Sequence, residues 1–123
     1  ILDGPPGIGC PVISTITGVD KVVIVTEPTI SGFHDLKRIV ELVKKFNLQI
    51  FVIINKYDLN LSVASQIKTW CLRKDISLAE YLPFDENVIN AMVQKKSIIE
   101  LNPELEISLK LNMIWYIIKN QKK

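Results

Sequence analysis

Short, unbroken apolar runs alternate along this chain with longer stretches in which apolar residues recur at helical spacing. Two runs stand out because they are rich in β-branched residues, Val22-Val23-Ile24-Val25 and Ile50-Phe51-Val52-Ile53-Ile54. Such runs are typical of strands that are buried on both faces of a parallel sheet. Their alternation with helical stretches indicates an α/β fold, in which each strand is followed by a loop and a helix.

The same pattern predicts the order of the elements. The predicted strands are a stub at Ile1-Leu2, then Lys21 to Thr26, Gln49 to Ile54 and Ile76 to Leu82. The predicted helices are Val12 to Thr17, a helix capped by Ser31 that runs up to Asn47, Val63 to Lys74, Glu86 to Lys95 and Pro103 to Lys119. Together these elements predict a three-layer fold with a mainly parallel sheet and flanking helices.

Composition is consistent with one compact piece and no more than one domain. The 123 residues are 48% apolar and 23% charged, which is ordinary for a packed α/β protein. The net charge of +2 indicates no special attraction to nucleic acid or membrane, and the apolar runs are too short to span a bilayer. We therefore expect a cytoplasmic protein. Two cysteines, Cys10 and Cys71, with one histidine cannot by themselves hold a structural zinc or an iron-sulfur cluster.

The first chemical signal is the run from Asp3 to Pro11, which reads Asp-Gly-Pro-Pro-Gly-Ile-Gly-Cys-Pro. A carboxylate at the end of a buried strand, followed by a Gly/Pro loop, is how nucleoside triphosphatases present the acid on the magnesium side of their site. Their phosphate-binding loop, G-x-x-x-x-G-K-[ST], occurs nowhere in the sequence, which also does not begin with Met. We interpret the chain as the C-terminal part of a larger protein, carrying half of an active site.

The second signal is Asn55-Lys56-Tyr57-Asp58, directly after a predicted strand. An Asn side chain donates and accepts hydrogen bonds at once, which suits the edge of a base. A polar strand exit that merely favours turns would look the same. Ligands of open parallel sheets bind beyond the carboxyl ends of the strands, so several polar groups are expected to face one crevice. They are Asp3, Thr26-Glu27-Pro28, Asn55 and Pro83-Phe84-Asp85.

Two families pair these motifs, and the GTPases are the weaker match. Asn55, Lys56 and Asp58 fit their Asn-Lys-x-Asp motif, in which the last Asp chelates N1 and N2 of guanine. Their Asp-x-x-Gly switch loop does not fit, because Gly4 and Gly7 follow Asp3 by one and four residues.

The chain resembles far more closely the deviant-Walker ATPases of the MinD/ParA/Mrp superfamily, which read Asp-x-Pro-Pro/Ala-Gly-hydrophobic at the first loop. The resemblance covers nearly the whole segment. Gly9-Cys10-Pro11, Thr26-Glu27-Pro28-Thr29 and the run from Gly32 to Arg38 are similar to the subgroup with an inserted ferredoxin domain. The resemblance implies a partial P-loop NTPase fold, with residues 1–123 as the C-terminal portion of one ATPase domain, from the Walker B and switch loop to the C-terminal helix.

The resemblance also implies roles for particular residues. Asp3 would be the Walker B carboxylate that holds magnesium through a bound water, and Gly4 to Gly9, including Gly7, would form the switch loop that senses the γ-phosphate. Asn55 would contact the adenine, with Asp58 in the same nucleotide-binding motif. The loop from Pro83 to Asp85 would contribute backbone contacts to the base.

For the intact protein the resemblance implies binding and hydrolysis of ATP with magnesium, a homodimer, and iron-sulfur or electron-transfer chemistry in the part outside this chain. The chain alone is expected to be inactive, because it lacks the phosphate-loop lysine and hydroxyl. The family's phosphate-loop strand would lie beside Lys21 to Thr26, so without it this strand becomes an apolar edge that invites pairing, while the other strands stay contiguous. The alternative class is a non-catalytic interaction or regulatory module with a degenerate nucleotide site.

Overall fold

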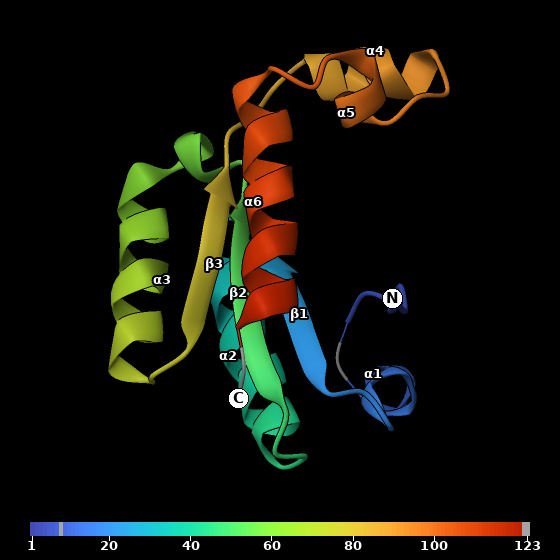
Figure 1. Ribbon diagram of the computed structural model, residues 1–123. Coiled ribbons are helices and arrows are strands. Elements are labelled where there is room, and N and C mark those ends of the chain that lie inside the picture. The colour runs from blue at the N-terminus through green and yellow to red at the C-terminus, as the bar shows by residue number, and fades with distance from the viewer. Residues whose placement is uncertain (8, 122–123) are drawn as a thin grey trace.

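The computed structural model describes residues 1–7 and 9–121, and its centre is a parallel sheet with helices on both faces (Figure 1). The strands β1 (Lys21–Thr26), β2 (Gln49–Asn55) and β3 (Ser77–Leu82) lie in the order β1-β2-β3 and pair in parallel. The crossover helices α2 (Ile30–Lys44) and α3 (Leu61–Arg73) cover one face, and α6 (Glu106–Asn120) covers the other. The predicted three-layer α/β class is confirmed.

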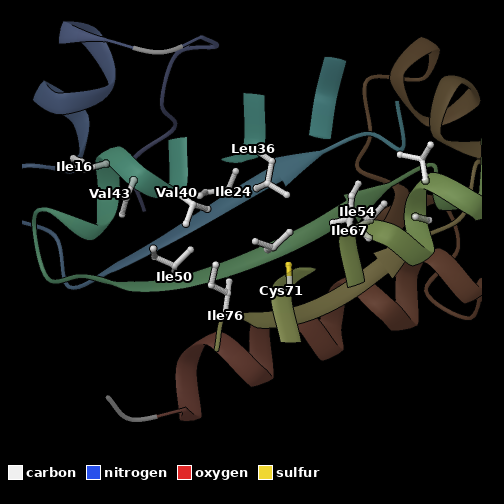
Figure 2. Packing of buried hydrophobic residues seen from close by; sticks show 13 residues of the cluster. Ile16, Ile24, Leu36, Val40, Val43, Ile50, Ile54, Ile67, Cys71 and Ile76 are labelled. Carbon is white, nitrogen blue, oxygen red and sulfur yellow. The ribbon is translucent and has the colours of Figure 1, made fainter. Parts of the chain in front are cut away.

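The central strand β2 is buried on both faces, which explains its unbroken apolar sequence. Its residues Ile50, Val52 and Ile54 belong to the core under α2 and α3, which Figure 2 shows from close by. Phe51 and Ile53 belong to the second core, under α6. Full burial of one such side chain contributes about 1.5–3 kcal/mol, so the two cores hold the sheet between its helices.

The two crossover helices begin earlier than the apolar periodicity predicts. Thr29 caps α2, with its hydroxyl oxygen 2.9 Å from the backbone nitrogen of Gly32, so the predicted Ser31 cap is wrong. Thr29 has the extended backbone that a cap requires, whereas Ser31 is already helical. Asn60 caps α3 in the same way, by accepting from the backbone nitrogen of Val63 at 3.1 Å. Helix α2 also ends at Lys44, short of Asn47.

The last third of the chain holds more short elements than predicted. Helix α4 (Asn87–Val93) is shorter than expected, and α5 (Ile98–Leu101) is an unpredicted single turn that Ser97 caps. Helix α6 begins at Glu106 and not at Pro103, since the buried Ser108 hydroxyl donates to the Asn102 carbonyl at 2.7 Å and fixes a non-helical turn there.

No helix of the described residues is long and apolar enough to cross a membrane.

The start of the chain differs most from expectation. Ile1 and Leu2 form no strand and are exposed, because a two-residue stub has no neighbour with which to pair. The following helix α1 (Cys10–Ile16) begins at Cys10, two residues before the predicted start at Val12. Within the described chain β1 is an edge strand and the three strands are contiguous, as predicted.

Candidate functional site

The loops that leave the three strands meet at one edge of the sheet. The parallel register pairs Thr26 with Ile54 and Asn55 with Leu82, so the carboxyl ends of the strands are level. The loop after β1 begins at Glu27, the chain after β2 enters a short 3₁₀ turn, η1 (Tyr57–Leu59), and β3 leads into the Pro83 to Asp85 loop. In parallel α/β sheets this edge is where ligands bind.

An ion pair ties the β1 exit to the β2 exit. The ammonium of Lys56 lies 3.2 Å from a carboxylate oxygen of Glu27, and both side chains are partly exposed. Such a pair contributes at most about 1 kcal/mol, so its effect is to orient the two loops. Lys56 has a φ of 53°, in the left-handed region that non-glycine residues seldom adopt. This conformation turns the chain sharply between Asn55 and η1.

A second contact ties the β2 exit to the β3 exit. A carboxylate oxygen of Asp58 accepts from the backbone nitrogen of Phe84 at 2.9 Å. Within the same loop, one oxygen of Asp85 accepts from the backbone nitrogen of Asn87 at 2.8 Å and from its side-chain amide at 2.9 Å. Both predicted acidic residues therefore hold loop structure.

A basic residue of α6 reaches this edge from the other layer. The Lys110 ammonium lies 3.1 Å from a Glu80 carboxylate oxygen, 3.1 Å from the Tyr81 carbonyl and 4.8 Å from the centre of the Tyr81 ring. The Tyr81 ring in turn packs 5.0 Å from the Tyr57 ring, which belongs to the predicted nucleotide motif. The Asn55 to Asp58 motif therefore packs, through Tyr57, against a cluster formed by Tyr81, Lys110 and Glu80.

The β1 exit is tightly packed in a way that sequence reasoning missed. The buried Thr26 hydroxyl lies 3.2 Å from the Gly32 carbonyl. A Cβ placed on Gly32 would lie 2.7 Å from the Glu27 carbonyl oxygen and 2.8 Å from the Thr29 hydroxyl oxygen. Glycine is needed here because the start of α2 approaches the loop backbone too closely for a side chain. The signal in the sequence is Gly32 itself, which comes three residues after Thr29, the last residue of the Thr-Glu-Pro-Thr segment.

Asp3 makes no hydrogen bond or ion pair with the other predicted site residues in the part of the chain that the structure describes. The N-terminal segment lies beside α1 at the outer side of β1 (Figure 1), and Asp3 is exposed without a hydrogen bond or ion pair to any described residue. Gly7 has a φ of 97° and Gly9 a φ of 126°, conformations that favour glycine. The predicted switch loop from Gly4 to Gly9 includes Ile8, which lies outside the described residues.

Asn55 differs from Lys56 and Asp58 in that its side chain holds no loop contact among the described residues. It is half-buried at the end of β2, and its side-chain amide makes no hydrogen bond to any described residue. Pro83 is also half-buried, one residue from the Asp58 contact. The structure therefore brings Asn55, Asp58, Pro83 and Asp85 to one edge of the sheet.

One hollow lies at the opposite edge of the sheet, and a second runs along β3 as far as Tyr81. The first, of about 230 Å³, is lined by residues at the amino ends of β1 and β2, and the second, of about 400 Å³, lies beside α3. Cys71 borders the second hollow, and burial raises the pKa of its thiol to about 11. Among residues 1–7 and 9–121, no group of three His, Cys, Asp or Glu side chains is placed to hold a metal ion.

Two curated relatives are proteins of Methanocaldococcus jannaschii. Uncharacterized protein MJ0578 is 31% identical over 110 residues, and uncharacterized protein MJ0579 is 29% identical over 103 residues. The alignments cover 89% and 83% of the chain but 36% and 34% of the relatives, so the chain spans about a third of their length. No protein-family model matches the sequence.

The fold matches solved structures that include cell division MinD proteins and a ParA family ATPase. The Pyrococcus furiosus cell division ATPase MinD has a TM-score of 0.77 at 19% identity, over 95% of the chain and 49% of MinD. The Pyrococcus horikoshii septum site-determining protein MinD, complexed with Mg-ADP, has a TM-score of 0.78 at 19% identity, with 96% and 49% covered. A ParA family ATPase from Chlorobium tepidum has a TM-score of 0.67 at 17% identity, with 91% and 47% covered. The chain therefore has the fold of about half of a MinD-like P-loop protein.

Proposed function

We propose that residues 1–123 are the C-terminal portion of an ATPase domain of the MinD/Mrp type, and that the full-length protein binds and hydrolyses ATP with magnesium in the cytoplasm as a homodimer. The Asp3 loop, the Asn55 motif and the shared fold support this proposal. The observation that carries it is the state of Asn55, whose amide is unengaged while the residues around it fix the loops.

The chemistry of Asn55 suits adenine. Its amide oxygen accepts from the exocyclic N6 amine, and its NH₂ group donates to the neighbouring ring nitrogen, so one side chain satisfies both. The backbone of the Pro83 to Asp85 loop lies at the same edge and would flank the base. Within this loop, the Asp85 carboxylate accepts hydrogen bonds from Asn87, and these bonds hold the loop in its fold.

Asp3 and Gly7 would serve the phosphate end. The Asp3 carboxylate is exposed and unpaired among the described residues, and carboxylate oxygen is a ligand that magnesium prefers, directly or through water. Magnesium, when bound, neutralises charge on the phosphates. Gly7 permits the left-handed turn that presents loop backbone N–H groups to a γ-phosphate.

We propose further that any iron-sulfur or electron-transfer coupling resides outside this chain. The residues here do not fit a cluster, which needs several thiolates together, because Cys10 is exposed on α1 and Cys71 is buried beside β3. The 123-residue chain by itself is expected to show no ATP hydrolysis, since its sequence lacks a phosphate loop.

Calorimetric titration of the full-length protein with ATP and GTP, with and without magnesium, tests the proposal. We expect ATP to bind in preference to GTP, Asn55→Ala to weaken ATP binding about tenfold or more, and Asp3→Ala to abolish the effect of magnesium. Asn112→Ala is the matched control, because this exposed asparagine on α6 makes no described side-chain contact. Indifference to every nucleotide would refute the proposal and favour a non-catalytic interaction module.

A further inference from the structure

The outer strand β3 has side chains bonded to the backbone at its free edge. A free strand edge presents backbone N–H and C=O groups with which another chain can pair. At Tyr81 two side chains take these groups. The Tyr81 backbone nitrogen donates to a carboxylate oxygen of Glu80 at 3.1 Å, and the Tyr81 carbonyl accepts from the Lys110 ammonium at 3.1 Å. The Lys110 ammonium also lies 3.1 Å from the same Glu80 oxygen, so the three residues form a closed ring of contacts.

These contacts supply what a neighbouring strand would supply. The N–H and C=O of one strand residue point to the same side of the strand. Because the Tyr81 N–H is directed to Glu80 and not to β2, both backbone groups of Tyr81 lie at the free edge. There the Glu80 carboxylate acts as the acceptor, and the Lys110 ammonium as the donor, that a paired strand would present. The two side chains are only 21% and 19% exposed, so salt screens their attraction less than at an open surface.

A bulge beside the ion pair makes the same edge irregular. Leu78 pairs with Val52 and Glu80 pairs with Ile53, so Ala79 has no partner on β2. A bulge bends its strand and increases the local twist, which is one of the ways in which edge strands avoid pairing with other chains. The bulge and the ion pair therefore act at neighbouring positions of one edge.

We propose that the Glu80–Lys110 pair closes the β3 edge against strand addition by a second copy of this chain. The two outer strands differ in this respect, because no ion pair of the described residues involves a residue of β1. Without the pair, β3 of one copy is free to join an outer strand of another copy. A β3–β3 contact closes as a two-fold dimer, whereas a β3–β1 contact runs on as an open fibre.

Sedimentation velocity of the full-length protein tests the proposal with the double variant Glu80→Val/Lys110→Met. This variant removes both charges together, so neither is left half-buried without its partner, and Val suits a strand. We expect species larger than those of wild type, in a fraction that rises with concentration. Glu41→Val/Lys119→Met is the matched control, because these exposed residues of α2 and α6 carry the same charges and make no described side-chain contact. A Glu80→Val/Lys110→Met variant that associates no more than this control would overturn the proposal.

Amide hydrogen exchange at Tyr81 tests the contact itself, and it decides the proposal if the double variant fails to fold. At low concentration, exchange at Tyr81 should be severalfold faster in Glu80→Val than in wild type, because the acceptor of this N–H is gone. Unchanged exchange would overturn the proposal, since the N–H would then bond elsewhere.

The same measurement locates the new interface. In the associated double variant, exchange at Tyr81 should slow severalfold as the concentration rises, because an added strand accepts from its N–H. Lys110→Arg keeps a donor for the Tyr81 carbonyl and a partner for Glu80, so it should sediment like wild type. Larger species without added protection at Tyr81, or association of Lys110→Arg as strong as that of the double variant, would overturn the proposal.

Discussion

At the scale of single residues, Cys71 shows how burial changes chemistry. It is fully buried on the inner face of α3, and burial raises the pKa of its thiol from 9.0 to about 11. The unfolded chain therefore releases this proton at lower pH than the folded chain does. The Cys71 contribution to stability is fully present below pH 9, and it is lost as the pH rises toward 11, by on the order of 2 kcal/mol.

Urea unfolding of wild type and Cys71→Ala at pH 8 and pH 10.5 measures this loss. The Ala variant is less stable at pH 8, because it leaves a small cavity, but we expect its free energy of unfolding to fall less between the two pH values. Cys10→Ala is the control, since Cys10 is exposed. Equal pH dependence in wild type and Cys71→Ala would contradict the prediction.

Gly32 gives a second prediction at this scale. Its substitution by Ala brings a Cβ within 2.7 Å of the Glu27 carbonyl oxygen, a backbone atom that cannot move without shifting the loop. We expect Gly32→Ala to destabilise the protein by about 1–3 kcal/mol, the usual cost of overpacking, although Ala is the better helix former. Urea unfolding measures it, with Ser62→Ala in the first turn of α3 as the control. A stabilised Gly32→Ala variant would show that the loop gives way easily.

At the scale of elements, the sequence predicts strands better than helix ends. The runs in β1 and β2 are continuous and β-branched, so the strand bounds are correct to within one residue. Helix starts are missed where Thr29 and Asn60, which lie before the apolar periodicity begins, act as caps. Helix α5 is missed because four residues carry too little periodicity to be recognised.

The residues at the strand exits of the candidate site are predictable from the sequence, whereas the contacts that join these exits are not. A strand exit is visible in the sequence, so the grouping of Asn55 with Pro83 and Asp85 follows from the parallel order of the strands. The ties between the exits are not visible, because the Lys56–Glu27 and Asp58–Phe84 contacts join residues that are distant along the chain. Tertiary contacts of this kind leave no local pattern.

The single turn of α5 should depend on its cap. The Ser97 hydroxyl accepts from the Glu100 backbone nitrogen, and the Glu100 carboxylate accepts from the Ser97 backbone nitrogen, so the two residues form a capping box. We expect Ser97→Ala to cost about 1 kcal/mol, because the turn places Ile98 in the second core. Urea unfolding tests this, with Ser62→Ala as the control. A variant with wild-type stability would contradict it.

The hydrogen bond that the Glu100 carboxylate accepts from the Ser97 backbone nitrogen is the main cause that lowers the pKa of Glu100 below its usual 4.5. The box is therefore complete above that pH, and its contribution is lost as the pH falls through the lowered pKa. The destabilisation caused by Glu100→Ala should therefore shrink in acid, because this variant lacks the carboxylate whereas Ser97→Ala keeps the backbone N–H that bonds to it. Urea unfolding of wild type and Glu100→Ala at pH 6 and pH 3 measures the difference, and an unchanged gap would argue against a role for the carboxylate.

At the scale of the whole molecule, β1 is an edge strand, with no further strand beside it among the described residues. Val23 and Val25 are 37% and 60% exposed, yet they pair in register with Phe51 and Ile53, which are buried under α6. The covering layer therefore stops at β2 and leaves one face of β1 apolar and open. An open, apolar edge strand invites pairing with another chain.

We expect the 123-residue chain by itself to associate through this edge, and Val25→Lys to shift it toward monomer, because a charge on an edge strand opposes strand pairing. Sedimentation velocity over a range of concentrations measures the association. Val93→Lys is the matched control, since Val93 on α4 is 79% exposed and lies away from β1, so this variant should associate like wild type. A monomer at every concentration would contradict the prediction. If both variants associate as strongly as wild type, the interface lies on another surface. If only Val25→Lys loses association, the interface lies at β1.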